Sequence, residues 1–216
     1  MPVATLYDVH GNIRALEAVL QEVPDDATII VGGDVAAGPF PQETVDVLRA
    51  LGDRVRWIRG NADRELVVGE AGLAPPELLD WVRSKLDAGT IEWLGGLPPT
   101  LVWEGVLYCH ATPRNDVDIF TERTPEERIA FLFEDAAADV IVCGHTHMQF
   151  DRTIADKCVV NSGSVGMSYD EPHGAYWRLD LEPRYTPYEL DLGGYPFEWP
   201  ALSHEEAVTL FEARAV

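Results

Sequence analysis

The sequence predicts an α/β fold in which parallel strands are covered by helices. Short apolar runs alternate with segments of helical periodicity over the first sixty residues, and polar residues follow the ends of those runs. A strand–helix–strand order favours parallel strands, because a crossover connection must return the chain to the same end of the sheet. Sheets of this kind bind ligands at the carboxyl ends of their strands, so these polar residues are expected at one sheet edge.

The elements of the first sixty residues follow from their apolar patterns. In residues 13–23, the apolar side chains Ile13, Leu16, Leu20 and Val23 fall on one helical face. The same reasoning predicts a second helix over residues 44–51. Buried strands are predicted at residues 3–7, 28–31 and 55–58.

The middle of the chain is less regular. Two proline pairs bracket a helix predicted over residues 77–86, and a tight turn at Glu104-Gly105 predicts a hairpin of residues 100–103 and 106–109. Residues 124–127 (TPEE) have the pattern of a capping box with proline at the first helical position. This pattern predicts a helix that continues through Ala138.

The last third is predicted to begin with a buried strand at residues 140–143. Antiparallel strands with short turns are expected at residues 150–154, 158–160, 175–179 and 185–190. A second capping box, residues 203–206 (SHEE), begins a C-terminal helix. There is no internal repeat and no linker, so we expect a single domain over residues 1–216.

Charge and composition limit the partners. With 37 acidic and 16 basic residues, the formal net charge is −21, which disfavours extended nucleic acid and anionic membranes as partners. A small phosphorylated substrate is compatible, because bound metal ions dominate the field in a pocket. The three cysteines show no paired spacing and are interpreted as reduced thiols.

The sequence shows no signal peptide and no spanning segment of about 18–20 apolar residues, which predicts a cytoplasmic protein.

Four short motifs and one isolated histidine supply metal-ligand side chains in a fixed order. They are Asp8-Val9-His10, Gly33-Asp34, Gly60-Asn61, His110 and Gly144-His145-Thr146-His147. Two carboxylates, one amide and four imidazoles are what two adjacent divalent ions need, with water filling the rest. Extended backbone after the first strand would point Asp8 and His10 the same way. A carboxylate at Asp34 can give one oxygen to each ion.

These motifs resemble those of the calcineurin-like metallophosphoesterase superfamily, and their spacing is closest to its small bacterial and archaeal phosphodiesterases. The resemblance implies an α/β fold with a two-sheet β-sandwich core flanked by helices, in four layers α/β/β/α. It also implies two divalent metal ions, whose identity (Mn, Fe, Zn, Ni or Co) stays open. By this analogy Asp8, His10 and His147 hold one ion, Asn61, His110 and His145 the other, and Asp34 bridges them.

The reaction implied by the resemblance is hydrolysis of a small phosphoester by a metal-bridging hydroxide, without a covalent intermediate. Asp34, Asn61 and His110 are the expected catalytic residues, and Asn61 with Arg114 the expected substrate contacts. Many superfamily members carry histidine after the asparagine, and here that position is Ala62. This departure points to a phosphodiesterase subgroup and leaves the proton donor to the leaving group open.

Several neighbouring residues allow two interpretations. Arg64 and Arg114 are phosphate contacts or surface arginines, and His173 is a loop histidine or a substitute proton donor. Asp63 either orients a ligand or is a solvated loop carboxylate.

Other functions stay open beside the phosphodiesterase. A hydrolase of dinucleoside polyphosphates or nucleotides would release a phosphate leaving group, which needs no protonation. A protein-interaction scaffold resembling the small retromer subunit is a third option, although such scaffolds tend to lose ligands and this chain has all seven. The physiological substrate is open, as is the oligomeric state, with a homo-oligomer as one option.

Overall fold

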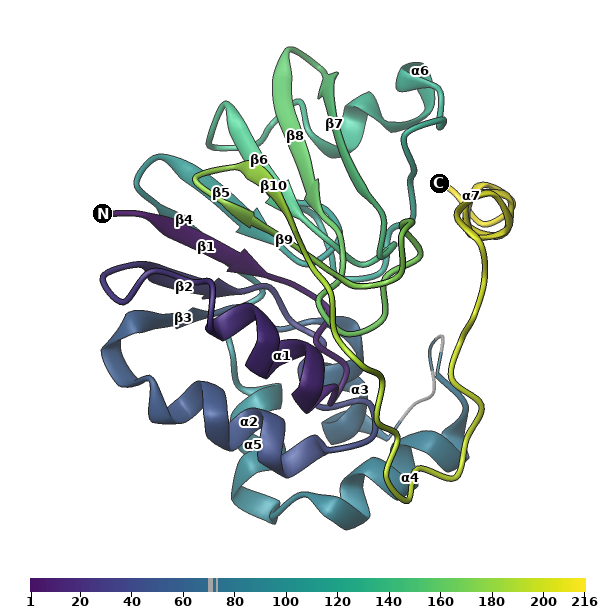
Figure 1. Cartoon of the computed structure of the whole chain (residues 1–216). Coiled ribbons are helices and arrows are strands. Elements are labelled where there is room, and N and C mark those ends of the chain that lie inside the picture. Colours follow the sequence, from purple (N-terminus) through teal and green to yellow (C-terminus); the bar gives the residue numbers. More distant parts are fainter. Residues whose placement is uncertain (70–71, 73) are drawn as a thin grey trace.

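Two five-stranded sheets lie face to face at the centre of the computed structural model, which describes residues 1–69, 72 and 74–216 (Figure 1). The strand orders are β10-β9-β1-β2-β3 and β4-β5-β6-β8-β7. The strands are β1 Val3–Leu6, β2 Thr28–Val31, β3 Val55–Trp57, β4 Thr100–Trp103, β5 Val106–Cys109, β6 Val140–Cys143, β7 Gln149–Ile154, β8 Lys157–Ser162, β9 Ala175–Leu179 and β10 Glu182–Thr186. The helices are α1 Ile13–Leu20, α2 Pro41–Ala50, α3 Asn61–Val68, α4 Pro76–Lys85, α5 Ala88–Gly95, α6 Glu126–Ile129 and α7 His204–Glu212.

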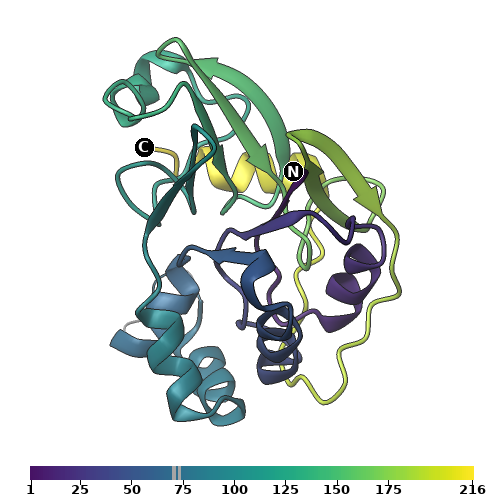
Figure 2. The same ribbon diagram turned by 90° about the vertical axis from the view of Figure 1, so that its left-hand side faces the viewer.

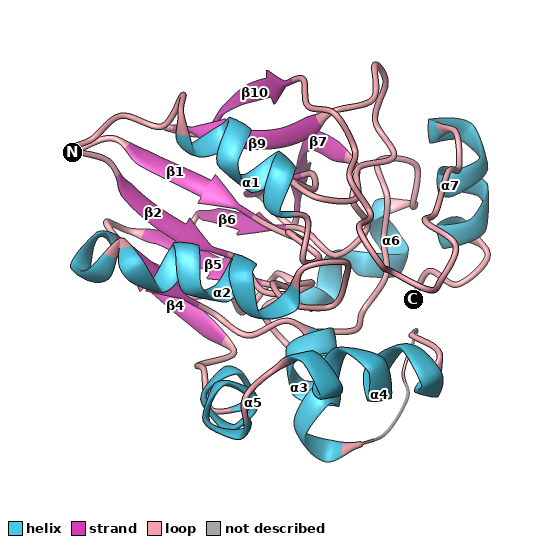
Figure 3. Cartoon of the chain, turned by 60° about the horizontal axis from the view of Figure 1, so that its bottom comes forward, coloured by secondary structure: helices cyan, strands magenta, loops and turns pink. Residues whose placement is uncertain are grey.

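The first sheet is built on three parallel strands, β1, β2 and β3. The strand β9 pairs antiparallel with β1, and β10 closes this side of the sheet. Helices α1 and α2 lie over the sheet (Figure 3), and their apolar residues Leu16, Val19, Val45 and Leu48 are fully buried. The parallel arrangement predicted from the alternation of apolar runs and helices is therefore confirmed.

The second sheet repeats this plan with β5, β6 and β8 in parallel and with antiparallel strands β4 and β7 at its edges. Its outer face packs against α6 and the 3₁₀ turn that follows it, through buried residues such as Ile129, Leu132 and Phe133. Tyr7, Ile30, Ile58, Tyr108, Val142 and Val160 fill the space between the sheets. The hydroxyl of Tyr7 donates to the carbonyl oxygen of Val142 across this interface at 3.0 Å.

Helices on one outer face, two sheets and a short helix on the other outer face form the four-layer α/β/β/α arrangement that the resemblance implied. Figure 2 shows the same layering from the side, with the purple and blue helices below the strands. The hairpin of β4 and β5 is confirmed, with Trp103 opposite Val106. The capping box before α7 is confirmed as well, because Ser203 and Glu206 exchange hydrogen bonds.

Some predicted boundaries were wrong. The helix expected through Ala138 ends at Ile129, and residues 130–132 form a 3₁₀ turn. The hydroxyl of Thr124 does not cap this helix, because it accepts from the backbone N–H of Thr121 and contacts Glu212. The first helix ends at Leu20 instead of residue 23, and the strand expected over 185–190 is β10, which ends at Thr186.

Helix α3 was not anticipated from the sequence. Its polar residues Asn61, Asp63 and Glu65 are all buried, so its inward face shows no apolar stripe. Amphipathic patterning therefore has no signal in this segment.

After β10 the chain leaves the sheets, runs past α4 and then reaches α7 (Figure 1). Helix α7 packs its buried residues Ala207, Val208 and Phe211 against Met148 and Tyr169. None of the helices in the described part of the chain combines the length and apolar composition needed to cross a membrane.

One buried arginine ties the two sheets together. Arg178 of β9 is only 2% exposed, and its guanidinium donates to the carbonyl oxygens of Asn161 and Leu181 at 2.9 Å each. It also pairs with Asp151 of β7 at 2.9 Å. A charge withdrawn from water in this way is stable only with such partners.

We predict that Arg178→Met lowers the free energy of unfolding by about 3 kcal/mol, because it leaves buried carbonyl oxygens without donors. The measurement is urea denaturation of both proteins. Arg14→Met is the control: Arg14 is 54% exposed, and its loss should cost no more than about 0.5 kcal/mol. Equal stability losses in the two variants would contradict this role for Arg178.

Candidate metal centre

The seven residues predicted from the motifs meet at the carboxyl ends of the parallel strands. Asp8 and His10 follow β1, Asp34 follows β2, and Asn61 follows β3. His110 follows β5 of the second sheet, and His145 and His147 follow β6. All seven are buried, the most exposed being His10 at 8%. The expectation that these groups gather at one edge is confirmed, and both sheets contribute.

The backbone at the site is unusual. Asp8, His10, Asp34, His145 and His147 all have positive φ angles, between 48° and 70°. The prediction that Asp8 and His10 leave the strand in extended form was therefore wrong. Residues other than glycine rarely adopt this left-handed conformation, although Asp and His tolerate it better than most. Each instance costs of order 1–3 kcal/mol, and such residues concentrate at functional sites.

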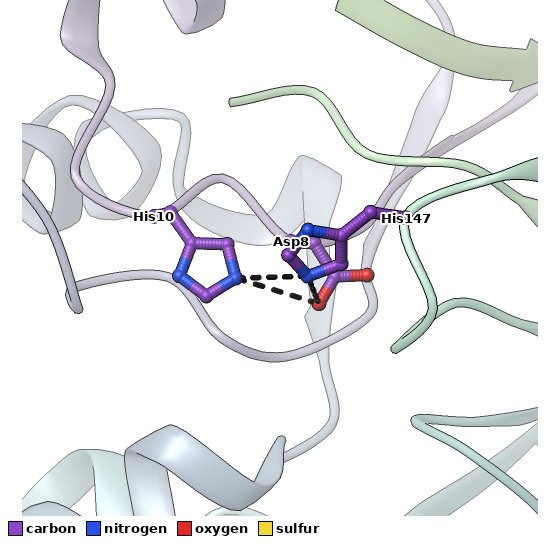
Figure 4. Close-up of side chains that lie close together, drawn as sticks. All are labelled: Asp8, His10 and His147. Carbon is purple, nitrogen blue, oxygen red and sulfur yellow. Dashed lines mark hydrogen bonds and ion pairs between the residues drawn. The ribbon is translucent and has the colours of Figure 1, made fainter. Parts of the chain in front are cut away.

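A first group of ligand atoms comprises Asp8, His10 and His147, which point toward one another in Figure 4. The Oδ1 atom of Asp8 lies 3.4 Å from Nε2 of His147 and 3.8 Å from Nε2 of His10. The two imidazole Nε2 atoms are 3.1 Å apart.

A second group lies beside the first, around His110. Its Nε2 atom is 3.4 Å from Oδ2 of Asp34, 3.2 Å from Oδ1 of Asn61 and 3.2 Å from Nδ1 of His145. The carboxylates connect the groups: Oδ1 of Asp8 lies 3.8 Å from Nε2 of His110, and Oδ2 of Asp34 lies 3.9 Å from Nε2 of His10.

The protons of three imidazoles point away from the centre. Nδ1 of His10, His110 and His147 lies 3.1, 2.9 and 2.8 Å from the carbonyl oxygens of Ala37, Gly32 and Met167. A carbonyl oxygen only accepts, so in the neutral ring Nδ1 carries the proton and Nε2 presents a lone pair. This arrangement is the usual one for metal-binding histidines.

Acceptor atoms therefore face acceptor atoms. Oδ1 of Asp8 is buried without a hydrogen-bond partner among the described residues. Buried acceptors at these distances repel unless a positive charge lies between them. Imidazole nitrogens with carboxylate and amide oxygens suit divalent transition metals, so the residues present fit the metal ions that the motifs predicted.

The shifts in the pKa values of the ligand residues also indicate that the site favours a bound positive charge. Burial lowers the pKa of His110, but the Asp34 and Asp8 carboxylates outweigh it and raise the pKa to about 10. Burial together with the nearby His110 lowers the pKa of His145 to about 4. Burial would raise the pKa of Asp34, yet the surrounding histidines hold it below its usual range. A proton on His110 would offset the charge of one of the two carboxylates, whereas a divalent metal ion at this place would offset both.

Asp63 holds two of the loops in place. Its carboxylate accepts from the backbone N–H groups of Asp34 at 2.8 Å, Gly60 at 3.0 Å and Val35 at 3.2 Å. It is fully buried, so its interpretation as a solvated loop carboxylate was wrong. Burial, together with the adjacent Asp34 carboxylate, raises the pKa of Asp63 to about 7.

The structure does not bring the other candidate residues to the seven. The guanidinium of Arg114 lies 5.0 Å from the centre of the Phe131 ring and lines a separate hollow. Arg64 forms a two-pronged ion pair with Asp116, at 2.9 and 3.1 Å. His173 is exposed and lies beside Tyr188.

Sequence reasoning missed part of the surroundings. A cavity of about 360 Å³ opens beside the centre, and Tyr169 and residues of the C-terminal segment line it. The Tyr169 ring stacks on the imidazole of His147, with ring centres 5.4 Å apart. No local pattern marks these residues as site residues, because they reach the centre only through tertiary contacts.

Comparison with known proteins points to the same family that the motifs resemble. A model of the calcineurin-like phosphoesterase superfamily domain matches residues 1–184. The chain is similar to the symmetrical bis(5′-nucleosyl)-tetraphosphatase of Cronobacter sakazakii, with 37% identity over 122 residues, or 51% of this chain and 43% of that protein. It therefore spans less than half the length of this curated relative. An uncharacterized protein of Methanocaldococcus jannaschii is 23% identical over 195 residues, covering 79% of this chain and 72% of that one.

Two solved structures share the fold. A metallophosphoesterase from Sphaerobacter thermophilus has a TM-score of 0.73 at 23% identity and covers 88% of this chain and 89% of its own. A hypothetical protein from Pyrococcus horikoshii has a TM-score of 0.72 at 21% identity, with 88% of each chain covered.

We predict that Gly60→Ala weakens manganese binding by about tenfold or more, as loss of support for a ligand typically does. A Cβ atom at position 60 would overlap the Asp34 carboxylate and displace it. Isothermal titration calorimetry with Mn²⁺ measures the effect. Gly194→Ala is the matched control, because its Cβ would meet no atom of the described residues within 4 Å. Unchanged affinity in Gly60→Ala would rule out this dependence.

Proposed function

Because the chain belongs to the calcineurin-like phosphoesterase superfamily, we propose that it is a metal-dependent phosphoesterase acting on phosphodiesters. The observation that carries this proposal is the set of buried acceptor atoms that face one another, above all Oδ1 of Asp8 among three histidine Nε2 atoms. Such a set fits cations that in turn attract the negative oxygens of a phosphoester.

We propose that Asp8, His10 and His147 hold one divalent ion. The other would be held by Asn61, His110 and His145, with Asp34 between the two. The closeness of the ligand atoms of Asp8, His10 and His147 supports the first set. The second set is supported by the short distances from Nε2 of His110 to Asn61 and His145, and Asp34 lies near His10 and His110. When bound, such ions supply Lewis acidity toward the phosphoryl oxygens and lower the pKa of a water molecule that attacks phosphorus. Manganese stays a prediction, as does the number of two ions.

The chain's own contribution is to hold the ligand atoms in place before the substrate arrives. Each carboxylate has one oxygen fixed by the backbone: Oδ2 of Asp8 accepts from the N–H of His145, and Oδ1 of Asp34 from that of Ala62, both at 2.8 Å. The other oxygen of each faces the centre. Ligands held in this way need little reorganisation on binding, which favours catalysis.

The residue at position 62 limits which leaving groups the site can release. The side chain of Ala62 lines the cavity beside the centre and carries no proton to donate. Leaving groups that depart without a proton are then favoured, such as aryloxides and phosphates. This reasoning supports a diester with a good leaving group.

A second candidate is hydrolysis of dinucleoside polyphosphates, in which the leaving group is a phosphate. The similarity to proteins named symmetrical bis(5′-nucleosyl)-tetraphosphatase favours it. A small phosphoester is the substrate in both cases.

Three further properties stay predictions from the sequence: a single domain over residues 1–216, a cytoplasmic location and the exclusion of extended nucleic acid as a partner.

We predict that the protein with Mn²⁺ hydrolyses bis(4-nitrophenyl) phosphate, and that Asp34→Asn lowers kcat/KM by about 100-fold or more. The substitution removes a negative charge that both ligand groups share. Losing a residue that merely supports a metal ligand costs up to about 100-fold in activity, so losing the charge of a ligand should cost at least that much. The release of 4-nitrophenolate is the measurement. Asp139→Asn, a surface aspartate 93% exposed, should keep full activity. No turnover with manganese, nickel, cobalt or zinc would refute the proposed function.

We predict that kcat/KM is higher for the aryl diester than for 4-nitrophenyl phosphate and for diadenosine tetraphosphate, measured with the same metal. The diester carries less negative charge, which suits a protein with a net charge of −21. Preference for the tetraphosphate would transfer support to the second candidate.

A further inference from the structure

The cavity beside the candidate metal centre has two chemically different walls. One wall carries ligand residues of the centre, among them Asp34, His145 and His147. The opposite wall comes largely from the C-terminal segment, residues 195–214, through Tyr195, Phe197, Leu210 and Phe211. This segment lies beyond residues 1–184, which match the family model. It is therefore a feature of this chain that the family's shared motifs do not specify.

The C-terminal segment is anchored by aromatic contacts. The Tyr195 ring meets the Trp81 ring of α4 edge-on at 5.2 Å, and Phe197 packs edge-on against Tyr195 at 5.5 Å. At the other end Phe211 of α7 lies 6.1 Å from Tyr169, which stacks on His147. Figure 1 shows the segment running from α4 to α7 on the side toward which β1 points. The wall is thus packed against the same edge that holds the metal ligands.

The chemistry of this wall selects a kind of ligand. The aromatic rings of Tyr195, Phe197 and Phe211 offer apolar surface, and the aliphatic side chains of Leu210 and, from α4, Leu78 add to it. The volume of about 360 Å³ lies in the range of small-molecule sites. The charged residues Glu198 and Arg214 also line the cavity, and their opposite signs offset each other. Among the described residues that line the cavity, Arg214 is the sole lysine or arginine, so a long polyphosphate finds little cationic surface, whereas a flat uncharged ring finds stacking partners.

We infer that the C-terminal segment binds the uncharged aromatic group of the substrate, such as an aryl ring or a nucleobase, while the phosphoryl group lies at the metal centre. Tyr195 and Phe197 are the residues that determine this specificity. The inference rests on the proposed function for the position of the phosphoryl group, and it adds the class of organic group that the substrate carries.

The test compares two phosphonates that no hydrolase of this kind cleaves, phenylphosphonate and methylphosphonate. Calorimetry with the manganese-loaded protein gives their dissociation constants. We expect the wild-type protein to bind the phenyl compound about tenfold more tightly or better, as burial and stacking of a ring predict. Phe197→Ala and Tyr195→Ala should each reduce this preference by about threefold or more, with Mn²⁺ affinity unchanged.

Phe131→Ala is the matched control, since Phe131 is a partly exposed phenylalanine at a different hollow. It should keep the full preference for phenylphosphonate. Equal affinities of the two phosphonates in the wild-type protein, or no binding of either, would overturn the inference. So would a loss of Mn²⁺ affinity in Phe197→Ala, because the wall would then serve the metal centre instead of the organic group.

The failure of the inference and that of the proposed function are distinguishable. Hydrolysis of the aryl diester without a preference for phenylphosphonate would leave the phosphoesterase standing and remove the aromatic subsite. A preserved phenyl preference without turnover on any ester would support the subsite and remove the hydrolytic function.

Discussion

The structure depends on an electrostatic constraint: acceptor atoms are buried together and directed at one another. Oδ1 of Asp8 lies within 3.8 Å of Nε2 in His10, His110 and His147. The histidine protons are directed outward to backbone carbonyl oxygens, so a positive charge must come from a proton or a metal ion. The rise in the pKa of His110 to about 10, which the two carboxylates cause against the effect of burial, expresses the same demand.

The backbone pays for this convergence in strain and is held by local supports. Five ligand residues adopt left-handed conformations where strands end. Gly60 leaves room for the Asp34 carboxylate, and the Asp63 carboxylate binds the backbone N–H groups of Asp34 and Gly60 together. Gly60 and Asp63 thus position a ligand residue but are not proposed as metal ligands themselves. This explains why a buried acidic residue with a raised pKa is found beside the centre.

The centre and the opposite wall of the cavity have separate origins in the chain. The ligands lie between Asp8 and His147, within the part that matches the superfamily, whereas the aromatic wall comes from residues 195–214. The proposed site for the phosphoryl group and the proposed site for the organic group therefore come from different parts of the chain. Glu198 and Arg214 give that wall one negative and one positive charge, and on a strongly acidic protein this balance favours substrates of low charge.

Local sequence alone determined the α/β class, the parallel strands, the hairpin before His110 and the seven residues at the strand ends, because these follow from apolar periodicity and residue type over short stretches. Only the tertiary structure decided the left-handed backbone at Asp8 and His10, the short α6 and the buried polar face of α3. It also placed Arg114 in a hollow separate from the cavity beside the centre. It also decided the aromatic wall. The reason is physical: each of these depends on contacts between residues far apart in the sequence, such as Thr124 with Glu212 or Tyr195 with Trp81, which no local pattern encodes.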